Sequence, residues 1–303
     1  MRLVIALGGN ALLKRGEPLS AANQLRNMAT AAEGLARVCA GNEVAIVHGN
    51  GPQVGLLALE AALYTDVPPY PFDILGAESQ GMIGYIIAQS MRAAMPRRDV
   101  VALITQTLVD ANDPAFRHPT KPIGPIYTEA QVAALRTRCD WHFGLDGKHI
   151  RRVVASPEPL TIIEVDAIEH LVSAGVLTIC TGGGGIPVTL DVMAAHEATV
   201  KGAEAVIDKD LGAAVLAIKL KADHLIILTD VDGIYADWGQ PQQKLIRSIG
   251  VAELQSMKFA VGSMAPKVAA ACRFVSETGE PVSIGNLQAA EAVMAGAAGT
   301  LVS

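Results

Sequence analysis

The sequence predicts an α/β protein built around parallel strands that are buried on both faces. Two observations lead to this fold class. Residues 3–7 and 44–47 are short, unbroken apolar runs of the kind found in buried parallel strands, and 224–228 is a further predicted strand. The first two runs end in glycine-containing loops, and segments with the apolar spacing of a helix follow them. Strands that alternate with helices in this way form βαβ units around a parallel sheet.

Length and composition limit the number of domains and the kinds of partner. The 303 residues suffice for one large or two ordinary domains, and half of them are hydrophobic, so a sizeable core is expected. The net charge is −6 and no long basic run occurs, which argues against nucleic acid as a partner. No apolar stretch approaches the length of a membrane span, and the N-terminal segment lacks a signal-peptide pattern. We therefore expect a cytoplasmic protein without a membrane partner.

The four cysteines predict neither a zinc cluster nor a redox motif. Cys39, Cys139, Cys180 and Cys272 lie far apart, and no C-x-x-C pair occurs. Cys39 and Cys180 fall within apolar patterns and are expected to be reduced core residues. From the sequence we assign no protein ligands to a metal ion.

The first strands are predicted to end in loops that can bind an anion. The strand at 3–7 ends in Gly8-Gly9-Asn10, and the strand at 44–47 ends in a loop that begins at His48. Such loops present backbone N–H groups and a neutral amide, which suits a small carboxylate. A plain strand-to-loop turn is the alternative. We expect His48 to be a structural hydrogen-bonding residue rather than a base.

Helices are expected to follow these loops. Ser20 would cap the first helix, the second would follow the His48 loop, a third would cover 76–94, and a strand would cover 100–109. The inner faces of the first two helices are predicted to carry Leu25, Met28, Ala32, Leu35 and Cys39, then Leu56, Leu59 and Leu63.

Residues 110–159 differ in character from the segments on either side. Prolines punctuate this stretch, which is too long for a plain connection, so we expect a small protruding lid subdomain of turns and short strands. Lys121 lies between Pro119 and Pro122, and a stiff loop that presents one lysine fits a lid that closes over a site. An exposed surface lysine is the alternative. Residues 151–154 are predicted to form the strand that leads out of the lid.

A run of four glycines follows the next predicted strand. After a helix at 167–174 and a strand at 176–180 come residues 182–185, all glycine. Their unobstructed N–H groups predict a phosphate cradle, with a flexible hinge as the alternative. Strands at 224–228, 281–284 and 300–302 complete the expected sheet.

The segment Asp208-Lys209-Asp210 opens a predicted helix at 211–221. The two aspartates suit a helix start, whereas a lysine in a first turn opposes the helix dipole by about 0.3–1 kcal/mol. Either Lys209 is incidental and extends into water, or it is held between two carboxylates and directed at an anion. A second lysine, Lys267, lies near the start of another predicted helix, which Ser263 would cap. Two lysines in matching positions indicate a shared anion.

Several common catalytic motifs are missing from the sequence. It contains no G-x-x-x-x-G-K-[ST] loop, no protein-kinase H-R-D or D-F-G signature and no Gly-x-Ser-x-Gly elbow, and no G-x-G-x-x-G opens a helix in the first βα turn. The expected anion site is therefore built from glycine amides and scattered lysines.

Nine segments, in order along nearly the whole chain, closely resemble the amino acid kinase family, and within it the carbamate kinases. The most specific are residues 48–55, the proline-framed Lys121 segment and the Asp208-Lys209-Asp210 segment at 206–211. The others are residues 6–12, 79–85, 113–116, 151–157, 182–187 and 262–268.

The resemblance implies a three-layer αβα sandwich around a mainly parallel open sheet, the amino acid kinase fold. It implies an N-terminal lobe, residues 1–204, that includes the lid and binds carbamate, and a C-terminal lobe, residues 205–303, that binds ATP or ADP. It further implies a homodimer, a requirement for Mg²⁺, and the reversible reaction ATP + carbamate ⇌ ADP + carbamoyl phosphate.

The resemblance also implies roles for individual residues. Lys209 and Lys267 would hold the transferring phosphoryl group, Asp210 would orient these lysines, and Lys121 would close over the acceptor. No general base is needed, because carbamate is already an anion. The carbamate set is Gly8, Gly9, Asn10, Gly49, Asn50 and Gly51, and the nucleotide set is Gly183, Gly184, Asp208, Asp230, Val231, Tyr235, Met264 and Lys267.

Two other functions are compatible with the sequence. One is a related kinase that acts on another small carboxylate, although a larger acceptor would need side-chain recognition that the Gly-Asn loops do not offer. The other is a nucleotide-binding sensor without catalysis, against which the joint presence of the three lysines and Asp210 argues.

Overall fold

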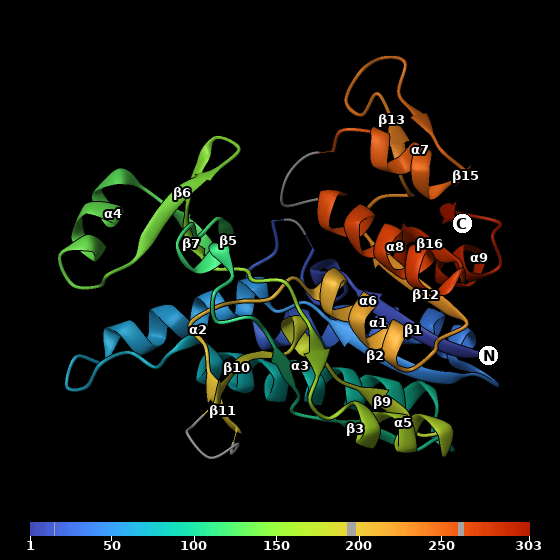
Figure 1. Cartoon of the computed structure of the whole chain (residues 1–303), viewed down its shortest axis with the longest axis horizontal. Coiled ribbons are helices and arrows are strands. Elements are labelled where there is room, and N and C mark those ends of the chain that lie inside the picture. Colours follow the sequence, from blue (N-terminus) through green and yellow to red (C-terminus); the bar gives the residue numbers. More distant parts are fainter. Residues whose placement is uncertain (15, 193–197, 260–263) are drawn as a thin grey trace.

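A computed structural model describes residues 1–14, 16–192, 198–259 and 264–303, and the side chains of Asn10, Val192 and Ala198 lie outside this description. At its centre is an eight-stranded sheet in the order β15-β17-β16-β12-β1-β2-β9-β3 (Figure 1). All neighbouring strands are parallel except β16 and β17. The strands are β1 Arg2–Leu7, β2 Glu43–His48, β3 Val100–Ala102, β9 Leu177–Ile179, β12 His224–Thr229, β15 Ser248–Ile249, β16 Val282–Asn286 and β17 Thr300–Val302.

Helices cover both faces of this sheet, which confirms the predicted three-layer sandwich. Strand β1 shows why: Leu3, Ile5 and Leu7 pack among residues of α1, α3 and α9 on one face. The side chains between them, Val4 and Ala6, pack among residues of α5, α6 and α8 on the other. An unbroken apolar run thus supplies two cores at once. The helices are α1 Ala21–Cys39, α2 Gly51–Leu63, α3 Phe72–Ala94, α5 Val165–Ser173, α6 Lys209–Lys219, α7 Val251–Ser256, α8 Met264–Thr278 and α9 Ala290–Met294.

The prediction of one strand over 100–109 is wrong. The chain forms β3 in the central sheet and then β4 (Gln106–Leu108) in a second sheet, of order β11-β10-β4-β8. Between them the side chain of Gln80 accepts a hydrogen bond from the N–H of Thr105 at 2.8 Å and donates to its carbonyl at 3.1 Å. A side chain from α3 therefore satisfies the backbone where the strand breaks. The other strands of the second sheet are β8 Thr161–Ile162, β10 Ile186–Val192 and β11 Ala198–Gly202.

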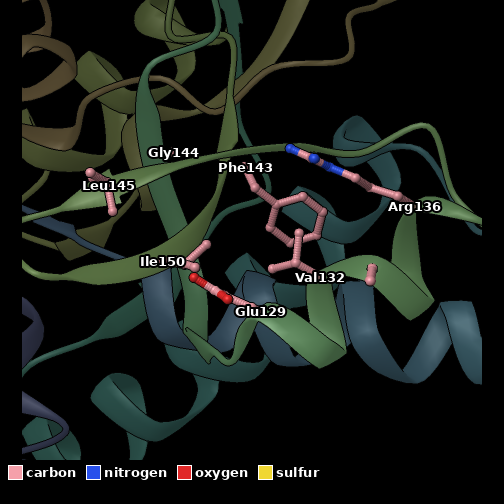
Figure 2. Close-up of a pocket in the computed structure, with 8 residues that line it drawn as sticks. Glu129, Val132, Arg136, Phe143, Gly144, Leu145 and Ile150 are labelled. Atoms are coloured by element: carbon pink, nitrogen blue, oxygen red, sulfur yellow. The ribbon is translucent and has the colours of Figure 1, made fainter.

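The predicted lid is present as a protruding unit, drawn in green in Figure 1. Its three strands form an antiparallel sheet in the order β5-β7-β6. It also contains a helix, α4, that the sequence reading missed, although Thr128 and Gln131 form a capping box at its start. Residues of α4, β6 and β7 line an open hollow of about 360 Å³ beside Phe143 (Figure 2). The elements are β5 Lys121–Tyr127, α4 Glu129–Arg136, β6 His142–Asp146 and β7 His149–Val154.

Three of the predicted inward-facing leucines are instead on the surface. Leu25 and Leu56 are exposed, and Leu63 is 74% exposed, whereas Met28, Ala32, Leu35 and Cys39 are buried as predicted. The apolar spacing predicted the correct helices but assigned too many residues to their buried faces. Ser20 caps α1 by accepting a hydrogen bond from the N–H of Asn23. The predicted cap at Ser263 lies outside the described residues. Within the described ranges, no helix has the length and hydropathy needed to span a membrane.

Candidate functional site

The glycine loops meet at one edge of the central sheet, because β1, β2 and β12 are parallel neighbours that end together. The N–H of Gly8 donates to the carbonyl of Leu228 at 2.8 Å, and the N–H of Gly49 donates to Leu7 at 3.2 Å. A Cβ on Gly8 would lie 2.9 Å from the Leu228 oxygen, so the close approach of β1 and β12 requires glycine here. The loop after β1 is therefore fixed by backbone contacts.

Gly49 brings the predicted acceptor loops against Lys209. A Cβ on Gly49 would lie 3.2 Å from Cδ of Lys209 and 3.9 Å from the backbone nitrogen of Gly9. Residues separated by 160 positions of sequence are therefore in contact at the edge of the sheet. The first two glycine loops and the lysine of the Asp-Lys-Asp segment therefore lie at one location.

Asp210 joins the two lysines at the starts of α6 and α8. Its Oδ1 accepts a hydrogen bond from Nζ of Lys209, and its Oδ2 accepts one from Nζ of Lys267 at 3.1 Å. Burial lowers the pKa of Lys209, and the charge of Lys267 lowers it further, while Asp210 opposes both. Burial also acts on Lys267, but the charge and hydrogen bond of Asp210 raise its pKa above the ordinary value. The shared carboxylate thus favours two ammonium groups side by side.

Of the two alternatives for Lys209, the incidental lysine that extends into water does not hold. Its side chain is only 12% exposed, because the long aliphatic stem lies along Gly49 and the ammonium group turns back to Asp210. The helix itself begins at Lys209, with Asp208 as its N-cap. The two aspartates therefore serve the helix start as predicted, and Asp210 also restrains the lysine.

Lys121 of the lid reaches the same helix start. Its Nζ lies 2.9 Å from Oδ2 of Asp208, while Oδ1 of Asp208 accepts hydrogen bonds from the N–H groups of Asp210 and Leu211. Burial would raise the pKa of Asp208, but the charge and hydrogen bond of Lys121, with the charge of Lys209, lower it to about 2. Asp208 is therefore a carboxylate held in its charged form. Lys121 is not the exposed surface lysine of the alternative interpretation.

A cavity of about 610 Å³ adjoins the cluster of Lys209, Asp210 and Lys267, and five of the residues predicted to contact a nucleotide line it. Lys267 belongs to both, since it lines the cavity and donates to Asp210. Tyr235 and Trp238 stand together in the wall, with ring centroids 5.2 Å apart. The predicted residues in the lining are Asp230, Val231, Tyr235, Met264 and Lys267. The sequence reading missed Thr229, Gly233, Asp237, Trp238, Met257, Lys258 and Phe259.

Three residues of the predicted nucleotide set, Gly183, Gly184 and Asp208, are not among the residues that line this cavity. Asp208 faces Lys121, as described above. A Cβ on Gly183 would lie 2.3 Å from Nδ2 of Asn50, and one on Gly184 would lie 2.8 Å from Ile207, so both glycines are packed tightly against neighbouring elements. The N–H of Gly184 already donates to the carbonyl of Thr181 at 3.0 Å. The four-glycine run is thus a site of close packing rather than the open cradle that its sequence indicates.

The remaining residues of the acceptor loops have different surroundings. Asn50 is buried and donates from Nδ2 to Ser79 at 2.8 Å, which fixes its amide against α3. Gly51 begins α2 with open space where a Cβ would stand. The side chain of Asn10 lies outside the described residues, although its backbone belongs to the short 3₁₀ turn Gly9–Ala11. His48 is fully buried, and this burial lowers its pKa to about 4, so it is the neutral, structural histidine that was predicted.

The two carboxylates of the Asp-Lys-Asp segment, Asp208 and Asp210, are both engaged with lysines. The described residues contain no group of three or more His, Cys, Asp or Glu side chains arranged for a metal ion. Asp230 lines the cavity, and its charge raises the pKa of the nearby Lys267.

A comparison with protein-family models identifies the family of this chain. The model described as the amino acid kinase family matches residues 1–286. The chain belongs to this family. Among solved structures, carbamate kinase from Giardia lamblia bound to AMP-PNP has a TM-score of 0.88 at 38% identity, covering 99% of this chain and 98% of that one. An isopentenyl phosphate kinase from T. acidophilum, at 16% identity and a TM-score of 0.53, is similar in fold alone.

Three relatives named carbamate kinase are similar to this chain over nearly their full length. Carbamate kinase from Escherichia coli O6:H1 is 51% identical over 301 residues, with 99% of both chains covered. Carbamate kinase from Haemophilus influenzae is 49% identical over 304 residues, covering 100% of this chain and 97% of the relative. The enzyme from Pyrococcus furiosus is 44% identical over 314 residues, covering 99% and 98%.

Proposed function

We propose that this protein is a carbamate kinase, which transfers a phosphoryl group reversibly between ATP and carbamate. One observation carries the proposal: Lys267 lines the 610 Å³ cavity and also meets Lys209 through Asp210. A nucleotide in that cavity would have its terminal phosphate next to two ammonium groups. The relatives named carbamate kinase, at about half identity over the whole chain, support the choice of acceptor.

The proposed mechanism is positioning and charge stabilisation. The transferring group carries negative charge on its oxygens, and Lys209 and Lys267 would face that charge from preset positions. Asp210 fixes both lysines before the substrate arrives, so no reorganisation is needed at the moment of transfer. Lys121 would contact the acceptor from the lid. Carbamate needs no base, because its oxygen is already negatively charged.

We propose that carbamate binds where the first two glycine loops meet Lys209. Gly49 lies against that lysine, the backbone nitrogen of Gly9 lies next to Gly49, and Gly51 opens α2. Backbone N–H groups at a helix start favour an anion. Gly8 and Asn50 would support this surface through their contacts with Leu228 and Ser79. The predicted role of Asn10 belongs to the same proposal.

Mg²⁺ fits the donor set at the cavity. This ion takes most of its ligands from water and substrate phosphates, together with one or two carboxylates. Asp230 would hold it from the cavity wall, next to Lys267. When bound, the ion neutralises charge on the nucleotide phosphates. The two aspartates of the Asp-Lys-Asp segment are engaged with lysines and keep their positioning roles.

Two lobes and a homodimer complete the proposal. Residues 1–204 would form the acceptor lobe and residues 205–303 the nucleotide lobe, joined side by side through β1 and β12.

The proposed homodimer would use the surface of α3. Exposed apolar side chains on this helix, together with Ile104 beside Gly81, offer a contact surface for a second copy of the chain, and we propose that the dimer is cytoplasmic. Tyr85 is 62% exposed on this helix, so Tyr85→Glu should convert dimer to monomer in analytical ultracentrifugation. A wild-type monomer would contradict the dimer.

The activity is tested with carbamoyl phosphate, ADP and Mg²⁺ as reactants. ATP formation well above a protein-free control is the expected result. A panel of acyl phosphates identifies a related kinase if another member is the better donor. Binding of ADP without ATP formation, in folded protein, would instead identify a silent sensor and overturn the proposal.

A further inference from the structure

We propose that Asp208 is a positioning residue that holds the lid lysine, Lys121, in place over the phosphoryl site. The inference rests on the proposed function, and it replaces the nucleotide contact that the sequence suggested for Asp208. Two oxygens of one carboxylate perform two separate tasks. Oδ1 caps α6 through the N–H groups of Asp210 and Leu211, and Oδ2 receives Nζ of Lys121 at 2.9 Å.

Backbone pairing leads Lys121 to Asp208 along a short path. In the lid, Lys121 is opposite Val154 in the ladder between β5 and β7. The next residue, Ala155, accepts a hydrogen bond through its carbonyl from the N–H of Val206 at 3.0 Å. Asp208 follows two residues later. The entry to the lid, the exit from the lid and the start of α6 are therefore aligned by main-chain contacts.

The base of the lid is also fixed against α2. A Cβ on Gly55 would lie 2.0 Å from Cα of Gly124, so the two backbones touch and leave no room for a side chain. Arg151 holds the same point of the lid by donating from Nη2 to the carbonyl of Gly124 at 2.8 Å. With the strand anchored, the remaining freedom of Lys121 is that of its own flexible stem. Asp208 removes that freedom.

The contact leaves the lysine able to bind an anion. An ammonium group has three N–H donors, and Asp208 receives one of them. The side chain of Lys121 stays 23% exposed, so its other donors can face a substrate. A carboxylate near a phosphoryl group would also repel it. Here two capping N–H groups and the ammonium group of Lys121 surround Asp208, and the positioning effect is expected to exceed the repulsion.

Two substitutions separate the contact from the helix cap. Asp208→Asn and Asp208→Ser both keep a good N-cap oxygen and remove the negative charge that Lys121 meets. We expect each to lower kcat/KM for carbamoyl phosphate by about 10- to 100-fold, the range for a lost charge-assisted hydrogen bond. The dissociation constant for ADP and the thermal unfolding midpoint should stay close to those of the wild type.

A double-mutant cycle with Lys121→Ala tests whether Asp208 acts through that lysine. The double variant Asp208→Asn, Lys121→Ala should be no slower than Lys121→Ala alone. If the two losses multiply, or if Asp208→Asn is as fast as the wild type, the inference is wrong. An inactive wild type would count against the proposed function instead.

A chemical readout tests the contact without any turnover. Acetic anhydride labels exposed amines, and peptide mass spectrometry compares Lys121 with Lys148, an exposed lysine at the lid's other end. Asp208→Asn should raise the labelling rate of Lys121 several-fold and leave that of Lys148 unchanged. Equal labelling of Lys121 in both proteins would show that Asp208 does not hold it.

Discussion

Nζ of Lys267, on α8, lies 3.1 Å from Oδ2 of Asp210, on α6, although the two residues are 57 positions apart. The other carboxylate oxygen of Asp210 receives Lys209. Asp210 is almost fully buried, with its side chain 4% exposed. Two cations from separate helices are thus fixed by one buried anion. Two buried ammonium groups with one carboxylate carry an unbalanced positive charge, which costs free energy. An anionic group that binds between the two lysines would balance that charge.

Asp210→Asn tests this arrangement. The variant keeps the shape of the side chain but leaves two buried ammonium groups without their counter-charge. We expect kcat to fall about 100-fold or more, and the free energy of unfolding to fall by about 3 kcal/mol. Steady-state kinetics and urea unfolding measure the two effects. Asp66→Asn, at an exposed position, is the control and should change neither.

Gly183→Ala tests the packing role of the four-glycine run. Gly183 has a φ of +64°, and its new Cβ would overlap Nδ2 of Asn50. We expect a loss of about 2–4 kcal/mol in the free energy of unfolding. Gly147→Ala is the matched control, since its φ is +61° with open space around it, and it should cost only about 1 kcal/mol. Equal costs would mean that backbone conformation alone requires glycine at 183.

Trp238 offers an optical test of the nucleotide cavity. It lines the wall beside Tyr235 and is 62% exposed, so an adenine nucleotide should change its fluorescence on binding. Titration of the wild type with ADP is expected to give a saturable change. Trp238→Phe should lose that change and retain binding by calorimetry, whereas Trp141→Phe in the lid should keep it. A signal that follows Trp141 instead would place the nucleotide elsewhere.

His48 gives stability a defined pH dependence. Burial lowers its pKa to about 4 in the folded protein, so the unfolded chain binds a proton more readily below pH 6.5. The stability from the neutral imidazole is therefore present above pH 6.5 and lost as the pH falls toward 4. Between pH 7 and 5 the loss attributable to this residue is about 2 kcal/mol. In urea unfolding, His48→Gln should show that much less pH dependence, and an unchanged slope would contradict the assignment.

The sequence was sufficient for the fold class because buried parallel strands have a distinct apolar pattern. It failed at residues 100–109, where the amide of Gln80 interrupts a strand from a distant helix. No local pattern records such a contact. The same limit applies at the start of α6. Asp208 and Asp210 were recognisable as helix-start residues, but the lysines that reach them from the lid and from α8 are distant in sequence.

Glycine was the least predictable part of the site. Gly49 and Gly183 follow similar strands, yet the first lies against Lys209 and the second against Asn50. A missing side chain leaves room for a lysine stem at Gly49 and for an asparagine amide at Gly183, and only the three-dimensional neighbours distinguish the two. The aromatic wall formed by Tyr235 and Trp238 was half recognised, since an exposed tryptophan near a predicted contact was its available signal.

The most direct test of the lysine site compares two positions on one helix. Lys209 begins α6 beside Asp210, and Lys219 ends the same helix on the surface. In ATP formation from carbamoyl phosphate and ADP, Lys209→Ala should lower kcat by about 1,000-fold with the fold intact by circular dichroism. Lys219→Ala should match the wild type. Near-normal turnover in Lys209→Ala would contradict the account, because the phosphoryl group would then be stabilised without this lysine.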